Sequence, residues 1–185
     1  ATNRIDRRQL VVSRALVGFL RLTRGKHHRS RLVARMSFGQ FNRTFRPNRT
    51  VADWLSRDRD QVDRYISDPL CGFDCTVGLW WDFLGGMLTL SPSAWRKDLP
   101  VHLFSGTADA VGEMGRGVRQ HFQAIREAGV EKVTLRLFEG GRHEMLNETN
   151  RDEVWHYLQS LCRVSGPLQE VKDPAVSTRM NAATD

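Results

Sequence analysis

The sequence predicts an α/β fold made of two unlike parts. Residues 1–97 carry helical patterning and no β-α-β unit, whereas residues 98–163 alternate short apolar runs with helical stretches. Short apolar runs separated by a helix are typical of buried parallel strands. We therefore expect a helical region followed by a small α/β region. Residues 164–185 contain neither aromatic side chains nor periodicity, which predicts a disordered tail.

The helical region is expected to begin with a basic amphipathic helix at residues 5–22. Apolar side chains recur there at helical spacing while arginines occupy other faces. The apolar set is Ile5, Val12, Leu16, Phe19 and Leu20, and the basic set is Arg7, Arg8, Arg14 and Arg21. This pattern predicts a helix that covers the outside of the helical region.

Three further helices are expected before the change of pattern at Asp98. The first is a short helix at residues 32–36, which is followed by a predicted loop at residues 37–50. The others are a short helix at residues 60–67 and a helix rich in Leu, Trp and Phe at residues 76–88.

The α/β region is expected to contain two strands and two helices. Residues 101–104 form a short apolar run, and a helical stretch at residues 115–128 follows. Val133–Phe138 alternates apolar and polar side chains, as a second strand would. Asn150 and Glu153 have the spacing of a capping pair for a last helix.

The net charge of +7 is concentrated at one end of the chain. Residues 1–50 hold 13 Lys and Arg but a single acidic residue, Asp6, so this segment carries +12 and the remainder −5. A basic arm of this kind indicates an anionic partner, such as a lipid headgroup or a nucleic acid, or else a solvated arginine-rich helix. No helix-turn-helix or zinc-finger pattern is present, so nucleic acid is not the expected partner.

Other features indicate the compartment and exclude some chemistries. No apolar run approaches the roughly 20 residues that span a membrane, so a soluble protein is expected. The three cysteines, Cys71, Cys75 and Cys162, form no even framework of disulfides and favour a reducing compartment. We expect a cytoplasmic location, with at most peripheral membrane contact. No second ligand pair follows Cys71 and Cys75, so neither a metal nor a cofactor is expected.

Two residues that could carry chemistry follow the predicted strands. Asp109 lies just beyond the first strand and His143 just beyond the second. Because neighbouring parallel strands lie about 4.8 Å apart and end at the same edge, a carboxylate and an imidazole there can reach hydrogen-bonding distance. This is the arrangement of a general base and the acid that orients it. The alternatives are a turn-forming aspartate and an ordinary loop histidine.

Two other motifs are weaker candidates. The segment that begins at His143 starts like the zinc-protease motif H-E-x-x-H, but Asn147 stands where the second histidine should be. Cys75 lies between Gly72 and Gly78 but lacks the strand-turn-helix context of a nucleophile elbow. We therefore interpret Cys75 as a residue of the helical region.

Several segments resemble the serine aminopeptidase S33 or monoacylglycerol lipase-like (lysophospholipase-like) branch of the α/β hydrolases. Residues 98–112 and 133–148, which contain Asp109 and His143, resemble the end of that fold, and segments between residues 37 and 73 resemble its cap. The resemblance implies a nucleophile elbow, then an inserted helical cap, then the acid and the histidine. It assigns Asp109 as the acid and His143 as the base of a triad.

The sequence departs from this family in two respects. Ala110 stands where proline usually follows the acid, which changes the rigidity of the turn. More importantly, no G-x-S-x-G motif occurs, nor do the strands that would precede the cap. The resemblance therefore implies the C-terminal part of an α/β-hydrolase fold, with residues 1–97 as cap, 98–163 as core segment, and the nucleophilic serine on an absent N-terminal segment.

The expected function is that of an esterase or lipase acting on a monoacylglycerol, a lysophospholipid or a similar acyl ester, with this chain alone inactive. Its cap is apolar, as an acyl-chain site would be, or simply as a core would be. The apolar residues concerned are Trp54, Leu79, Trp80, Trp81, Phe83 and Leu84. The alternatives are an S33-type aminopeptidase, and a non-catalytic module that binds a membrane or nucleic acid through its basic arm.

Overall fold

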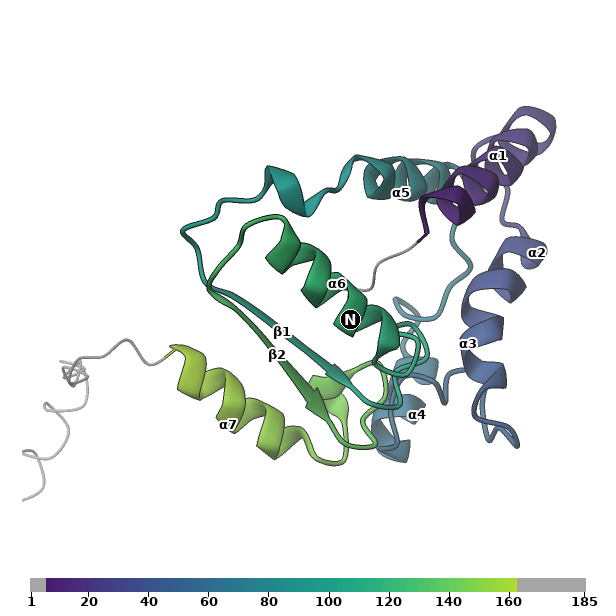
Figure 1. Ribbon diagram of the computed structural model, residues 1–185. Helices are drawn as coiled ribbons and strands as arrows, with labels where there is room; N and C mark the ends of the chain where they lie inside the picture. Colours follow the sequence, from purple (N-terminus) through teal and green to yellow (C-terminus); the bar gives the residue numbers. More distant parts are fainter. Residues whose placement is uncertain (1–5, 163–185) are drawn as a thin grey trace, which may run out of the picture.

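The computed structural model describes residues 6–162, and the predicted tail at residues 164–185 lies outside them. Helices make up most of the chain before residue 95, and a two-stranded sheet follows (Figure 1). The predicted fold class, a helical part combined with parallel strands, is therefore confirmed. No helix within residues 6–162 has the length and apolar character needed to span a membrane.

The two strands are parallel neighbours, as predicted. β1 (Val101–Gly106) pairs with β2 (Val133–Phe138) from Val101 opposite Val133 to Gly106 opposite Phe138. β1 is longer than the expected residues 101–104 because its pairing continues through Ser105 and Gly106. Within residues 6–162 the other edge of β1 has no strand partner.

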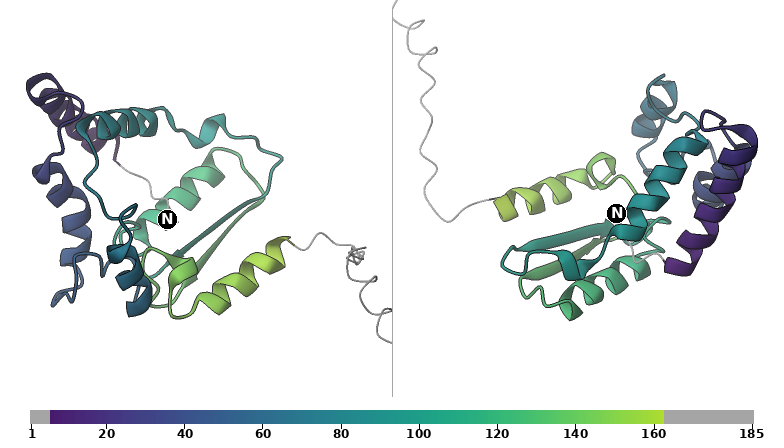
Figure 2. Two further views of the ribbon diagram at one scale, coloured as in Figure 1. Left: turned by 180° about the vertical axis from the view of Figure 1, so that it is seen from behind. Right: turned by 90° about the horizontal axis from the view of Figure 1, so that it is seen from above.

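Helices cover both faces of this small sheet. α6 (Arg116–Glu127) lies over one face and α7 (Arg151–Cys162) under the other (Figures 1 and 2). Alternation along the strands turns Leu103 and Leu135 towards α6, whereas Phe104 and Phe138 pack with α7. The result is the helix–sheet–helix layering of an α/β domain.

The start of α7 differs from the predicted capping pair. The side-chain amide nitrogen of Asn150 lies 3.4 Å from Glu153 Oε2, but the Asn150 side-chain oxygen accepts a hydrogen bond from Arg57. The side-chain oxygen that would cap the helix is therefore engaged with a residue 93 positions away in the sequence. A tertiary contact has replaced the local one.

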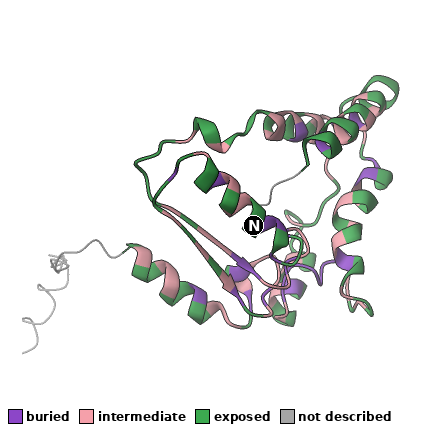
Figure 3. Ribbon diagram, viewed as in Figure 1, coloured by how far each residue is buried: buried purple, intermediate pink, exposed green. Residues whose placement is uncertain are grey.

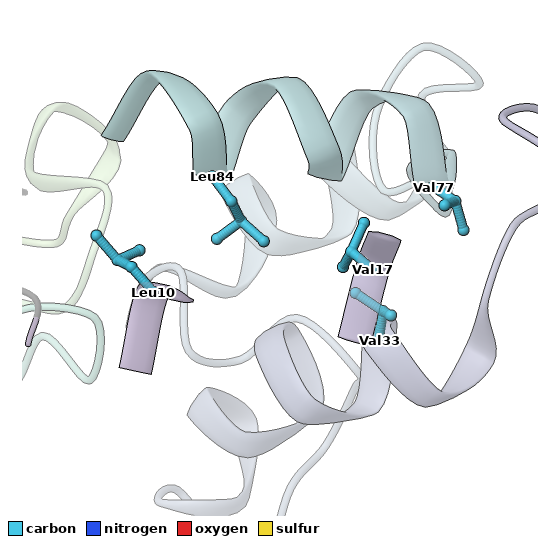
Figure 4. Packing of buried hydrophobic residues seen from close by; sticks show 5 residues of the cluster. All are labelled: Leu10, Val17, Val33, Val77 and Leu84. Carbon is cyan, nitrogen blue, oxygen red and sulfur yellow. The ribbon is translucent and has the colours of Figure 1, made fainter. Parts of the chain in front are cut away.

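The helical region is centred on the packing of α1 (Arg7–Arg24) against α5 (Val77–Thr89). Figure 4 shows the buried residues of this cluster. They are Leu10, Val17, Val33, Val77 and Leu84. Close approach is possible at Gly18, where an added Cβ would lie 2.6 Å from the Trp81 ring.

The predicted apolar face of α1 is partly wrong. Leu10 and Val17 are buried, whereas Val12 and Phe19 are 69% and 62% exposed. The arginines account for the difference, because the Arg14 guanidinium lies 4.2 Å from the centre of the Trp81 ring and turns towards α5. Arg21 lies over the same ring at 5.5 Å. The stacking of cations on an aromatic ring allows arginines to occupy a face that hydropathy alone assigns to apolar residues.

The loop predicted at residues 37–50 is also partly wrong. α2 (Arg31–Ala34) continues through a π-helical turn (Arg35–Gly39) into α3 (Gln40–Arg43), so helix extends well beyond residue 36. The Ser37 hydroxyl donates to the Val33 carbonyl and stays on the helix rather than breaking it. Gly39 is accommodated at an internal position of this irregular helix.

A second cluster connects the helical region to the α/β region. Its buried members are Ala52, Trp54, Leu55 and Val62, the last from α4 (Arg59–Ser67). Buried segments of the helical region converge near the ends of the strands (Figure 3). This second cluster therefore brings residues 52–62 to the edge of the sheet where Asp109 and His143 lie.

Candidate active site

Asp109 and His143 come together at the C-terminal ends of β1 and β2. His143 Nδ1 lies 3.2 Å from Asp109 Oδ1 and 3.4 Å from Oδ2. A carboxylate at this position accepts the Nδ1 proton, which leaves Nε2 unprotonated and able to accept another proton. The adjacency expected from the sequence is therefore present in the structure.

The two loops approach so closely because glycines face one another. A Cβ on Gly106 would lie 1.8 Å from the carbonyl oxygen of Gly141, a distance that no side chain tolerates. The Ala108 amide donates to the Gly141 carbonyl at 2.9 Å, and the Gly140 amide donates to Thr107 Oγ1 at 2.8 Å. These bonds hold the Asp109 loop against the His143 loop.

Asp109 is completely buried and has partners besides His143. Ser105 Oγ donates to Oδ2 at 3.2 Å, and the Val111 amide donates to Oδ1 at 2.9 Å. Burial alone would raise the pKa of Asp109, but the hydrogen bond and charge of His143 and the Val111 amide lower it below its usual value. The carboxylate therefore stays ionised where it faces the imidazole.

His143 is less enclosed than its partner. Its side chain is 25% exposed, so one part of the ring is accessible while Nδ1 faces a buried carboxylate. It lines a hollow of about 400 Å³ together with His102–Ser105 of β1 and residues 144–147. The Trp54 ring lies against the imidazole with ring centres 5.0 Å apart.

Glu148 supports the loop that carries His143. Its side chain is fully buried, and Oε1 accepts hydrogen bonds from the Arg142 amide at 2.9 Å and the Arg57 amide at 3.0 Å. Oε2 lies 2.9 Å from Arg57 Nε and accepts from the Thr149 amide. One carboxylate thus ties the residue before His143 to the helical region.

Arg142 makes a second connection between the same parts of the chain. Its guanidinium donates to the carbonyls of Asp53 and Ser56 and lies 4.2 Å from the centre of the Phe45 ring. Burial lowers the pKa of Arg142 despite the opposing charge of Glu148. The backbone on either side of His143 is held as well, because the Glu144 amide donates to the Leu55 carbonyl at 2.8 Å.

The weaker candidates lie outside this arrangement. Cys75 is in the segment before α5, and burial together with Asp74 raises the pKa of its thiol, with Arg29 opposing. A nucleophilic cysteine needs the opposite shift. Asn147, at the failed second position of the zinc motif, donates its side-chain amide to Glu144. Residues 6–162 contain no group of three or more His, Cys, Asp or Glu side chains placed to hold a metal ion.

Sequence reasoning missed the supporting residues. Glu148 and Arg142 were within the segment that resembles the hydrolases, but no spacing rule connects them to Arg57, which is 91 positions away from Glu148. A fully buried carboxylate in a polar loop segment has no sequence signature. Trp54 was identified only as one of several apolar cap residues.

Comparison with known proteins identifies the family of the chain. The family model described as serine aminopeptidase, S33, matches residues 7–150, which is more than half of the chain. No curated protein sequence matches it.

Solved structures also resemble the chain. A thermostable carboxyl esterase from Bacillus coagulans, in complex with glycerol, superposes with a TM-score of 0.74 at 21% identity over 83% of this chain and 51% of that chain. An open-form lipase gives a TM-score of 0.64 at 21% identity over 86% and 53%. A monoacylglycerol lipase from Paleococcus ferrophilus gives 0.47 at 31% identity over 57% and 40%.

This chain spans about half the length of the first two structures, whose fold it shares over most of its own length. Its helical region and two parallel strands correspond to part of an α/β-hydrolase fold. The order of these elements along the chain is the one that the family resemblance implies. The family match shows that the chain, whose fold is that of an α/β hydrolase, belongs to the serine aminopeptidase S33 family.

Proposed function

We propose that this chain supplies the general base, His143, and its orienting acid, Asp109, to a serine hydrolase that cleaves carboxylic esters. The observation that carries the proposal is the geometry of the pair. A buried, ionised carboxylate faces Nδ1 of an imidazole that is still partly accessible. The nucleophilic serine comes from a segment outside these 185 residues, since the sequence has no G-x-S-x-G motif.

The reaction follows from the orientation of the imidazole, whose Nδ1 faces the Asp109 carboxylate. Nε2 of His143 takes the serine proton while the serine oxygen attacks the ester carbonyl, and the imidazolium then protonates the departing alcohol. Water then attacks the acyl-enzyme while Nε2 takes one of its protons, the bond between the acyl carbon and the serine oxygen breaks, and the imidazolium returns that proton to the serine oxygen as the carboxylic acid leaves. Asp109 remains ionised throughout and stabilises the imidazolium.

An ester with an apolar acyl chain fits the side chains beside His143. Trp54 lies against the imidazole, and Phe38 stacks on Trp54 with ring centres 5.9 Å apart. Phe38 in turn lies 5.7 Å from Trp80, and Trp80 lies 6.0 Å from Phe83. We call Trp54, Phe38, Trp80 and Phe83 the aromatic row. It begins at His143 and ends at the molecular surface, where Phe38 and Phe83 are 37% and 52% exposed. An acyl chain would find apolar contacts along it.

The test uses the full-length protein that carries this chain. His143→Ala should lower the turnover of p-nitrophenyl butyrate by at least about 10⁴-fold and abolish labelling by a fluorophosphonate probe. His156→Ala is the matched control, because His156 is exposed on α7 and its one hydrogen bond within residues 6–162 is with a backbone carbonyl of its own helix. Normal turnover by His143→Ala would refute the proposal. Faster cleavage of an aminoacyl anilide than of the ester would favour a peptidase instead.

A further inference from the structure

α1 presents an apolar stripe on the side that faces away from α5. Val11, Val12, Phe19 and Leu22 are 52%, 69%, 62% and 88% exposed. At 100° per residue they fall within an arc of about 100°, opposite the buried Leu10 and Val17. We call these four residues the outer stripe. Figure 3 shows that α1 is largely exposed at the margin of the molecule.

The helix that follows α1 also has exposed apolar side chains. Leu32 and Met36 are 53% and 55% exposed and lie four residues apart, so they share one side of the helix that begins with α2. Single exposed apolar residues are ordinary on protein surfaces, but six large ones in two consecutive helices indicate a binding surface.

The charges around the outer stripe all have one sign. Exposed basic side chains lie before and after it along the chain, at Arg8 and from Arg24 onwards, and Asp6 is the only acidic residue in the first 50. Six of these exposed cations are Arg8, Arg24, Lys26, Arg29, Arg31 and Arg35. None of these six takes part in the ion pairs found between residues 6 and 162. Arg14 and Arg21 differ, because they pack on Trp81.

We propose that the outer stripe of α1 inserts into the interfacial layer of an anionic lipid bilayer, while the surrounding cations contact lipid phosphates. An exposed apolar stripe with unpaired cations before and after it along the chain is the pattern of a helix that lies in a membrane interface. A nucleic acid could bind the cations through its phosphates, but it has no acyl chains to cover Phe19 and Leu22. A lipid supplies both groups, so the charge and the hydropathy of this surface together favour a lipid partner. The proposal concerns a surface of α1 and does not depend on the reaction proposed at His143.

The experiment is vesicle co-sedimentation with the full-length protein. Phosphatidylcholine vesicles are compared with vesicles that contain about one third phosphatidylglycerol. The wild type should bind the anionic vesicles at least tenfold more tightly, and added salt should reduce this preference. Phe19→Ser with Leu22→Ser should weaken binding at least tenfold at every salt concentration. Arg24→Gln with Lys26→Gln should weaken it mainly at low salt.

Val51→Ser is the matched control, because Val51 is 81% exposed but lies outside α1. It should bind vesicles like the wild type, and all variants should keep the wild-type melting temperature. Equal binding by the outer-stripe variant and the wild type would overturn the proposal. So would a lower melting temperature of that variant, which would mean that protein covers the stripe. A dimer that dissociates on Phe19→Ser, or tighter binding to DNA than to vesicles, would likewise assign the surface to another partner.

Discussion

Glu148 and Arg57 form an ion pair of 2.9 Å between the loop that follows His143 and the helical region. The carboxylate has no exposed surface, whereas the Arg57 side chain is 34% exposed. Because the same carboxylate also accepts the amide of Arg142, the pair fixes the backbone next to His143. The position of the imidazole therefore depends on contacts with the helical region as well as on the sheet.

Replacing Glu148 by Gln should lower the free energy of unfolding by about 1–3 kcal/mol. The change removes the negative charge that pairs with Arg57, and it replaces one oxygen that accepts hydrogen bonds by an NH₂ group that can only donate them. Urea unfolding measures the free-energy difference. Glu153→Gln is the control, since the Arg136–Glu153 pair has side chains that are 45% and 51% exposed and should contribute less than about 1 kcal/mol. Equal losses in the two variants would contradict the role given to Glu148.

The aromatic row should determine the preference for acyl-chain length. Phe38→Ala should lower kcat/KM for a p-nitrophenyl octanoate by about tenfold, but leave the acetate nearly unchanged, because only the longer chain reaches beyond Trp54. Phe73→Ala is the control, since Phe73 is 53% exposed and takes part in none of the ring contacts within residues 6–162. The same loss for both esters would show that Phe38 supports the fold and does not bind the chain.

The strands and the helices of the α/β region could be predicted because local signals agreed there. The alternation within Val133–Phe138 and the position of Asp109 and His143 just beyond two parallel strands follow directly from the periodicity of the chain. Predictions from local sequence were wrong where a contact with a residue distant in the sequence determines the position of a side chain. Arg57 engages Asn150 at the start of α7, and Trp81 draws Arg14 to the inner side of α1.

The residues of the site also divide into those that local sequence predicts and those that depend on distant contacts. A sequence motif indicated Asp109 and His143. Glu148 bonds to Arg57, which is 91 positions away in the sequence, and no local pattern predicts that contact. The same holds for Trp54, whose contact with His143 depends on how residues 52–62 meet the sheet edge. Long-range packing of this kind is a property of the fold and not of any sequence window.

Acid should remove the stabilising effect of Asp109. Its pKa is lower in the folded chain than the ordinary value of 3.8, so ionised Asp109 stabilises the fold above that pH, and the effect is lost as the pH falls through the lower folded pKa. The free-energy difference between wild type and Asp109→Asn should therefore become smaller as the pH falls from 5 to below about 4. Urea unfolding at each pH measures this difference. Asp82→Asn, an exposed change on α5, should show no such narrowing.

The contact between Gly106 and Gly141 should be indispensable to the active site. In Gly106→Ala the added Cβ would lie 1.8 Å from the Gly141 carbonyl oxygen and 2.2 Å from its carbon, and neither backbone atom can rotate away. The two loops must separate, which should cost more than about 3 kcal/mol and move Asp109 away from His143, so ester turnover should fall with stability. Gly86→Ala is the matched control, because Gly86 lies inside α5 with open space around its Cβ position. That change should stabilise the helix by up to about 1 kcal/mol and leave turnover unaltered. If Gly106→Ala instead folds and turns over like the wild type, the close approach of the two loops is not what brings the acid to the base.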